Sequence, residues 1–568
     1  MVDRSSKKVI FCNSFTLLRR DINKYDGRGK YVLLNYNKQT FRVKKLLDDS
    51  NKYSEIGIKS FSSWKAQYLK KFVETMGCVN VANHKQYFWW GLSFTNKNPL
   101  ITPLCDAVYY ALFIAKVIEE DFDGEYLFVI GKDDDILKQL RIWFEGKDVE
   151  FRVIRSLQIQ KQDLKDVVRK YTPIAVFFAA SRAFIRKMQV GQIKLDTKEK
   201  HTVALSLLNH QSFQRGGGYS DTYFGKFVPY AAQKNAPLIN LFFVNSPDYG
   251  TMMRKIRKAK TGFVLMPLEY FLSTLDIMKC LFISLRRYFL GLSLIGDYSI
   301  DGKSVNHLIN AAIRREFRAT YFYDNIRIYY EIKNLVKKVS VKRIFYPFEN
   351  QAFEKLVLLV LRRYSSETKA VGYQHPSLSL RHANFLLTKQ EAEITPLPDK
   401  IMTMGDVTKE FMSTRGNFPD HILTRGCALR QKQPSGDVKN KRNISNIVVL
   451  LASNSEEYIK VIAFLNKALK IPNPYTVWLR PHPVFPLSDA IEIAGKPQFS
   501  YYESDKETLD ECLAWADVAV YVHSTSSIES LSRGLPVICL NIDNVISPDP
   551  LFSFTDFRWR AESPQDLV

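Results

Sequence analysis

Hydroxyl side chains gather where an apolar segment ends in the last part of the chain. Residues 516–522 are mostly apolar, His523 follows them, and a short helical pattern then runs to Gly534 before Pro536. Hydroxyls at a helix start cap free backbone N–H groups, and the same N–H groups bind phosphate with help from the helix dipole. The segment therefore indicates a phosphate site, with a serine-rich helix cap as the alternative. The hydroxyls are those of Ser524, Thr525, Ser526 and Ser527.

A histidine between two prolines closes another strand-like segment. Arg480, His482 and Pro483 follow the apolar residues 477–479. The prolines restrict the backbone around the histidine, and its imidazole can donate to a phosphate or to a leaving-group oxygen. These residues are a second candidate for phosphate binding, and an ordinary turn histidine is the alternative.

Both candidates belong to a pattern that predicts an α/β fold. Short apolar runs alternate with helical patterns along the chain, which is typical of parallel sheets built from βαβ units. Predicted strands include 126–131, 174–180 and 238–244, and residues 250–340 are rich in helical patterns. Ligands of open parallel sheets bind beyond the carboxyl ends of the strands, where both candidate segments lie.

A change in composition predicts two lobes. Residues 395–400 contain two prolines and no periodicity, as expected of a linker. Residues 1–395 would form an N-terminal lobe that includes the helix-rich part at 250–340. Residues 396–568 contain six strand candidates, enough for one Rossmann-like lobe. Because the sequence still resembles a folded domain at Val568, a further C-terminal segment is expected.

The charge and the cysteines narrow the function classes. The chain has 81 Lys and Arg against 58 Asp and Glu, a formal charge of +23, and such a surface attracts phosphate groups of nucleic acids, lipids or glycan precursors. We find no zinc-knuckle spacing and no aromatic-basic RNA-binding segment, so nucleic acid is not the expected partner. The seven cysteines form no CxxC pair, and no signal peptide opens the chain, which favours a cytoplasmic protein.

One segment raises the question of a membrane. Residues 263–295 are rich in Phe, Leu and Ile, but Asp276, Lys279, Arg286 and Arg287 lie in their middle. Charges at that depth are too costly for a spanning helix. Two buried helices are one interpretation, and a basic amphipathic face resting on an anionic membrane is the other.

The pairs His482-Pro483 and Ser526-Ser527 together resemble the CMP-binding signature of bacterial sialyltransferases, polysialyltransferases and Kdo transferases of the GT-B fold. The resemblance implies that the His-Pro pair contacts the phosphate and the base side of CMP, and that the serine pair holds the phosphate. An acidic residue on the same helix often holds ribose in GT-B enzymes, a role that falls to Glu529. The acidic Asp/Glu-Asp/Glu-Gly motif of some sialyltransferases has no clean counterpart, which argues against sialic acid.

Residues 346–382 are similar to bacterial surface-polysaccharide transferases, in which an acidic residue follows one strand and "GYQH" ends the next. The resemblance puts Glu349, Gln374 and His375 near a cleft between the lobes. Glu349 would act as acid or base, and His375 would orient the substrate or pair with the donor phosphate. The alternatives are a carboxylate that stabilises a helix N-terminus and a structural turn histidine.

Asp221 is the remaining candidate. It follows three glycines, 216–218, in a context similar to surface-carbohydrate proteins. In retaining Kdo transferases an aspartate of the N-terminal lobe is the nucleophile, and the resemblance implies that role for Asp221, with a covalent glycosyl-enzyme intermediate. A helix-capping aspartate is the alternative.

The sequence thus predicts a GT-B glycosyltransferase with an N-terminal acceptor lobe and a C-terminal donor lobe. The expected reaction moves a nonulosonic acid, with Kdo favoured, from a CMP-sugar to a lipopolysaccharide, O-antigen or capsule intermediate at the inner face of a bacterial membrane. No metal and no cofactor are expected, since a donor with one phosphate builds up less charge on leaving. The alternatives are a donor such as CDP-glycerol or a UDP-sugar, a non-catalytic nucleotide-binding protein, and a nucleic-acid binder.

Overall fold

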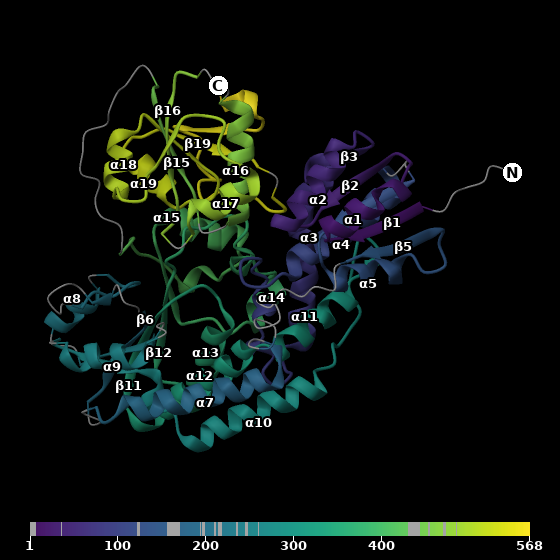
Figure 1. Ribbon diagram of the computed structural model, residues 1–568. Coiled ribbons are helices and arrows are strands. Elements are labelled where there is room, and N and C mark those ends of the chain that lie inside the picture. The colour runs from purple at the N-terminus through teal and green to yellow at the C-terminus, as the bar shows by residue number, and fades with distance from the viewer. Residues whose placement is uncertain are drawn as a thin grey trace.

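Three parallel sheets form the framework of the protein (Figure 1). A computed structural model describes residues 7–35, 37–121, 125–155, 168, 171–193, 195, 199–208, 212–213, 219–225, 227–234, 237–244, 248–259, 261–429, 444–452, 455–469, 473–483, 485–542 and 544–567. The strands of each sheet run parallel, and helices cover the faces of the sheets. The predicted α/β class, with parallel sheets in separate lobes, is therefore confirmed.

Five strands form the sheet of the N-terminal unit. From one edge to the other they are β3 (Tyr53–Glu55), β2 (Gly29–Leu33), β4 (Tyr126–Ile130), β1 (Lys7–Cys12) and β5 (Val149–Ile154). The helices are α1 (Phe15–Asp21), α2 (Lys38–Asp49), α3 (Ser62–Asn83), α4 (Leu104–Lys116) and α5 (Asp134–Trp143). Val9 and Phe11 pack into one core with α3 and α4, whereas Ile10 and Cys12 pack into another with α1 and α2. Because both faces are covered, β4 is apolar throughout and β1 is apolar after its first two residues.

Seven strands form the central sheet. From one edge to the other they are β14 (Leu423–Arg425), β13 (Lys400–Thr403), β12 (Lys369–Tyr373), β11 (Val341–Pro347), β6 (His201–Leu208), β7 (Leu238–Val244) and β8 (Val264–Pro267). The helices named below are α7 (Pro173–Val190), α10 (Thr274–Leu290), α11 (Asn306–Arg318), α12 (Thr320–Lys338), α13 (Ala352–Tyr364) and α14 (Lys389–Ile394). Helix α13 connects the neighbouring strands β11 and β12, the βαβ unit that the sequence predicts.

Six strands form the C-terminal sheet. From one edge to the other they are β17 (Tyr501–Glu503), β16 (Thr476–Arg480), β15 (Asn446–Leu450), β18 (Val518–Tyr521), β19 (Val537–Leu540) and β20 (Arg558–Ala561). The helices named below are α16 (Ser455–Ala468), α18 (Leu509–Trp515) and α19 (Ser526–Ser532). Strands β16 and β18 both pair with β15, so their carboxyl ends share one edge of the sheet.

The structure corrects the predicted boundary at residue 395. Strand β13 pairs with β12, and β14 pairs with β13, so both extend the central sheet. The prolines of 395–400 therefore lie in a connection within that sheet, and the C-terminal sheet begins at β15. The sheet reaches six strands through β20 in place of β13. The predicted N-terminal lobe, 1–395, likewise spans two of the three parallel sheets.

The strand predicted at 174–180 is also wrong, because these residues open helix α7. Thr172 Oγ1 accepts a hydrogen bond from the Ala175 N–H at 3.2 Å, and Pro173 occupies the first turn of the helix. A threonine cap followed by proline is a strong helix start. Thr172 and Pro173 therefore favour a helix, although the apolar run that follows them is typical of a strand.

A buried ion pair ties the N-terminal unit to the central one. Lys97 Nζ lies 2.5 Å from Glu391 Oε2, and the two side chains are 0% and 1% exposed. Asn80 of α3 donates to the other oxygen of Glu391, Oε1, at 2.7 Å, and Glu391 also caps α14. Removing one member of a buried pair leaves an uncompensated charge in the interior.

We therefore expect Lys97→Met to destabilise the protein by about 3–5 kcal/mol, because Glu391 loses its cation. Thermal and urea unfolding of the variant would measure this loss. Lys369→Met is the matched control, since Lys369 and Asp399 form a 3.2 Å pair that is 61% and 41% exposed and should contribute less than about 1 kcal/mol. Equal effects of the two substitutions would contradict a structural role for the buried pair.

Candidate active site between the lobes

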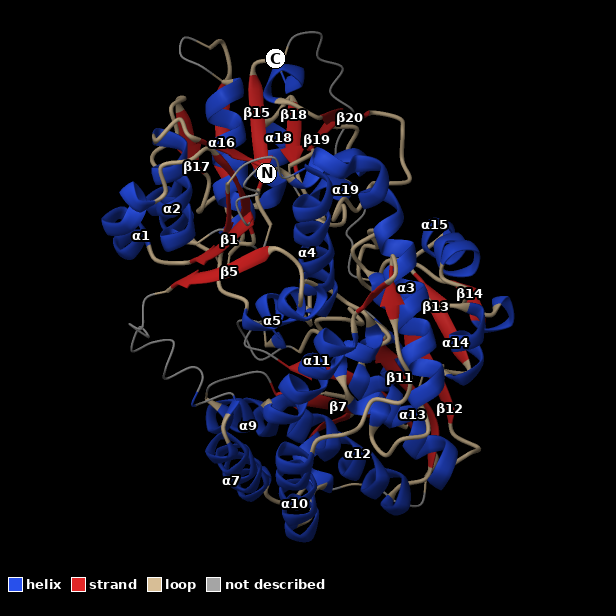
Figure 2. Ribbon diagram, turned by 90° about the vertical axis from the view of Figure 1, so that its right-hand side faces the viewer, coloured by secondary structure: helices blue, strands red, loops and turns tan. Residues whose placement is uncertain are grey.

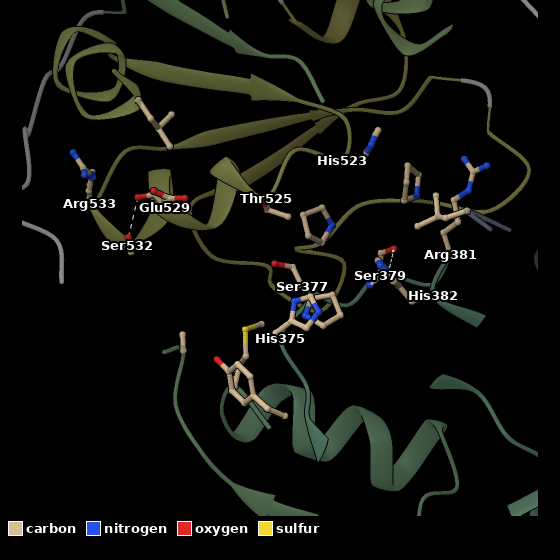
Figure 3. A pocket seen from close by; sticks show the side chains of 18 of the residues that line it. His375, Ser377, Ser379, Arg381, His382, His523, Thr525, Glu529, Ser532 and Arg533 are labelled. Carbon is tan, nitrogen blue, oxygen red and sulfur yellow. Dashed lines mark hydrogen bonds between the residues drawn. The ribbon is translucent and has the colours of Figure 1, made fainter. Parts of the chain in front are cut away.

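A large cavity lies between the carboxyl edges of the central and C-terminal sheets. Its volume is about 1010 Å³. In Figure 3 the segment after β12 enters it from below and the segment after β18 from above. The side chains used below are those of His375, Arg381, His382, His523, Thr525 and Glu529. The cavity is therefore built from two of the strand ends that the sequence singles out.

The central sheet contributes a histidine backed by a glutamate. His375 lies two residues beyond the end of β12, and Glu349 lies two residues beyond the end of the neighbouring strand β11. His375 Nε2 is 2.8 Å from Glu349 Oε1. Burial acts to raise the pKa of Glu349, but the interactions with His375, Gln351 and His382 together outweigh it, so the pKa lies below its ordinary value. The carboxyl group is thus ionised at neutral pH and can support a cationic imidazole.

The C-terminal sheet contributes a second pair of the same kind. His523 lies two residues beyond the end of β18, and its Nδ1 contacts a carboxylate oxygen of Glu457. Glu457 stands in the first turn of α16, directly after the neighbouring strand β15, and is buried. Its other oxygen accepts the Ala452 N–H at 3.2 Å. With Nδ1 on the carboxylate, Nε2 is the ring nitrogen left for the cavity.

A third histidine is held neutral in the same cavity. His382 Nδ1 accepts the backbone N–H of Ser379 at 3.1 Å, so the proton of the neutral ring must be on Nε2. Burial lowers the pKa of His382 to about 4. The side chain is therefore a neutral N–H donor of fixed tautomer at physiological pH.

Charged side chains occupy both ends of the cavity. Arg533, at the end of α19, pairs with Asp510 of α18. At the other end, Arg381 lies 3.4 Å from Asp106 of helix α4 in the N-terminal unit. Burial raises the pKa of Asp106, and Arg381 opposes that effect.

A second cavity, of about 250 Å³, adjoins the first and shares Arg381 and His523 with it. It is lined by Asn35 after β2, by Lys132 after β4, and by Lys460 of α16. The carboxyl edge of the N-terminal sheet therefore also faces this region. Among the described residues, no group of three or more His, Cys, Asp and Glu side chains is arranged to hold a metal ion.

The predicted phosphate-binding residues divide into two groups. Thr525 and Glu529 line the large cavity. Ser527 is fully buried and its hydroxyl donates to the Ser524 carbonyl at 2.8 Å, which is a structural helix contact. The residues that do not line either cavity are Arg480, His482, Pro483, Ser524, Ser526 and Ser527.

The His-Pro segment lies at the same sheet edge as the serine cluster. Arg480 donates to the Glu507 carbonyl at 2.7 Å and thereby holds the loop before α18. The His482 N–H donates to the Tyr458 hydroxyl at 2.7 Å. Burial lowers the pKa of His482, and the nearby His523 lowers it further. The two segments thus approach each other near His523.

Gln374 and Asp221 hold neighbouring backbone in place. Gln374 is fully buried, and its side-chain oxygen accepts the Met404 N–H at 3.2 Å. Asp221 is 3% exposed, and its Oδ1 accepts the N–H groups of Tyr223 at 2.8 Å and Phe224 at 2.7 Å. The Tyr223 ring in turn lies 4.6 Å from the His375 ring. Asp221 therefore reaches the site through Tyr223 and does not line the cavity; the glycines 216–218 before it lie outside the described residues.

Sequence reasoning did not assign a site role to several residues of the cavity. His382, Arg381, His523 and Arg533 line it, and Glu457 lines the second cavity and pairs with His523. One signal was present, since Tyr-x-His closes both β12 and β18, as Tyr373 to His375 and as Tyr521 to His523. Glu457 carries no such signal, because only the pairing of β15 with β18 brings it to His523.

Comparisons with known proteins give distant similarities. No family model matches the chain, and no curated protein matches it. Among solved structures, it is similar to the calicheamicin glycosyltransferase CalG4, with 10% identity over 65% of this chain and 88% of that chain and a TM-score of 0.36. S. aureus TarM, in a complex that includes UDP, is 10% identical over 65% of this chain and 91% of that chain, with a TM-score of 0.36. The wall teichoic acid polymerase TagF is 9% identical over 70% of this chain and 86% of that chain, with a TM-score of 0.29. At these values the matches decide neither donor nor acceptor.

The neutral state of His382 predicts a pH dependence of stability. The unfolded chain binds a proton at His382 near pH 6.5, whereas the folded chain does so only near pH 4. The contribution of His382 to the free energy of unfolding is therefore complete above pH 6.5. It declines as the pH falls toward 4, by about 3 kcal/mol in total. Urea unfolding over this range should show a shallower loss for His382→Asn than for the wild type. The exposed His421→Asn is the control, and an unchanged slope in His382→Asn would contradict the assignment.

Proposed function

We propose that the protein is a glycosyltransferase that uses a nucleotide-activated sugar. The observation that carries the proposal is that His375 and His523, from two parallel sheets and each paired with a glutamate, line one cavity. Ligands of open parallel sheets bind at the carboxyl ends of the strands. Two such edges at one cavity can hold a donor and an acceptor in reacting geometry, and such positioning supplies much of the rate of a bimolecular transfer.

The C-terminal side suits the donor. Thr525 offers a hydroxyl at the start of α19, and His523 offers an imidazole held by Glu457. Glu529 lines the same wall and is our candidate for the ribose hydroxyls. Arg533 supplies positive charge close to these groups. Such donors stabilise the negative charge that forms on a departing nucleotide phosphate.

The central side suits the acceptor. His375 would take the proton of the attacking hydroxyl, and Glu349 would stabilise the resulting imidazolium. The acceptor oxygen then bonds to the anomeric carbon while the bond from that carbon to the phosphate oxygen breaks. The leaving nucleotide keeps the electron pair. N–H groups of His523 and His382 would donate hydrogen bonds to it and stabilise its negative charge. The second cavity gives room for the rest of a glycan acceptor.

For the donor we propose a CMP-sugar, with Kdo as the sugar and a lipopolysaccharide, O-antigen or capsule intermediate as acceptor. The support is the sequence motif together with the approach of His482 to His523 at one sheet edge. A UDP-sugar or CDP-glycerol is the alternative donor, because the groups on the donor wall recognise phosphate and ribose without selecting a base.

Release of free nucleotide from CMP-Kdo, UDP-sugars and CDP-glycerol, with glycan acceptors present, tests both levels of the proposal. We expect CMP release and a heavier acceptor by mass spectrometry. His375→Ala should lower kcat by about 10²–10⁴-fold, because it removes the base. Glu349→Gln should cause a smaller loss, since the imidazole remains.

The control for these variants is His421→Ala, an exposed histidine of the central unit that does not line the cavity. Turnover of UDP-sugars alone would overturn the CMP donor and leave the transferase proposal standing. Full activity of His375→Ala with any donor would overturn the assignment of the base.

A further inference from the structure

Two neighbouring helices present large apolar side chains to solvent. On α7 the exposed fractions are 69% for Phe178 and 67% for Met188. On α10 they are 67% for Phe282, 71% for Phe289 and 73% for Leu290. The other exposed apolar side chains of the two helices are Ile174, Phe177, Phe184, Ile185, Leu275 and Met278. Isolated exposed apolar residues are common, but a contiguous set of this size marks an interaction surface.

The exposed residues follow the helical repeat. Ile174, Phe178, Ile185 and Met188 recur at the spacing that puts residues on one side of α7. The opposite side of the helix, with Ala175, Val176 and Ala179, is buried. In the same way α10 buries Ile277, Cys280 and Ser284 against the protein and exposes the side with Leu275 and Phe282.

The two helices lie side by side at the outer edge of the protein. Both views place them at the bottom of the molecule, on the far side from the C-terminal sheet (Figures 1 and 2). Lys187 of α7 donates to the Thr274 hydroxyl of α10 at 3.1 Å. We call this surface, formed by the exposed sides of α7 and α10, the apolar face.

The charges around the apolar face are basic. The two helices contain six Lys and Arg residues and a single acidic residue, Asp276. Asp276 is buried and caps its own helix through Ser273. Lys279 and Arg286 are exposed among the apolar side chains, whereas Arg182 pairs with Asp324 of α12 at 3.5 Å. A partner that is both apolar and negatively charged is complementary to such a surface.

We infer that the apolar face docks on an anionic lipid bilayer. Helices that lie in a membrane interface have a broad apolar side flanked by Lys and Arg, and each base near an anionic surface adds roughly 1 kcal/mol of attraction. No helix among the described residues is both long and apolar enough to cross a membrane. A second copy of the chain docked on this face would bring the Lys and Arg residues of both chains together, and their positive charges would repel each other. The inference depends on this surface alone and not on the proposed transfer reaction.

Vesicle flotation of the purified full-length protein tests the inference. We expect the wild type to float with vesicles of phosphatidylcholine and phosphatidylglycerol, and to bind pure phosphatidylcholine roughly tenfold less. Phe282→Ser with Phe289→Ser should lower binding to the anionic vesicles by roughly tenfold or more. Lys279→Gln with Arg286→Gln should also lower binding to the anionic vesicles, and the binding that remains should depend less on salt concentration.

Phe557→Ser with Trp559→Ser is the matched control, because these two aromatic residues of the C-terminal unit are 72% and 56% exposed. This variant should bind vesicles as the wild type does. Circular dichroism would show that each variant is folded. Equal binding of wild type and the α10 variants, or no preference for anionic vesicles, would overturn the inference. So would a dimer in light scattering that the α10 substitutions dissociate, since a second copy would then cover the apolar face.

Discussion

The site depends on the opposition of two parallel sheets across one cavity. Strands β12 and β18 end at this cavity from opposite sides, so the polar groups that follow them share a space of about 1010 Å³. In open parallel sheets, ligands bind in the crevice outside the carboxyl ends of the strands. The N-terminal sheet adds a third edge next to the first two, through Asn35 and Lys132. The buried pair of Lys97 and Glu391 helps to hold that unit against the central one.

The same local arrangement occurs in both facing lobes. A histidine follows one strand by two residues, and a glutamate after the adjacent strand holds one of its ring nitrogens. A carboxylate behind an imidazole fixes its orientation and stabilises its protonated form. His382 differs, since a backbone N–H occupies its Nδ1 and burial lowers its pKa to about 4. The cavity therefore contains imidazoles in different surroundings: two that are each paired with a carboxylate and one that stays neutral.

The sequence predicted the α/β class and singled out two strand ends that prove to line the cavity, because apolar runs and the polar residues after them are local signals. It missed what depends on pairing between distant strands. The boundary at 395 failed because prolines mark a connection but not the sheet to which the next strand belongs. The contact of Glu457 with His523 could not be predicted, because only the order of the strands in the sheet brings the two residues together. The sequence predicted only the part of the apolar face that belongs to α10. Residues 174–180 were predicted as a strand, so the exposed apolar side of helix α7 was not recognised.

Isothermal titration of CMP, CDP and UDP into the wild type and its variants tests the shared cavity most directly. We predict that at least one nucleotide binds the wild type and that His523→Ala with Thr525→Ala weakens binding by roughly tenfold or more, because these side chains line the cavity on the proposed donor side. His375→Ala, on the opposite wall, should bind the free nucleotide nearly as the wild type does. Nucleotide binding that ignores the donor-wall substitutions, or no binding of any of the three, would contradict the claim that this cavity is the nucleotide site.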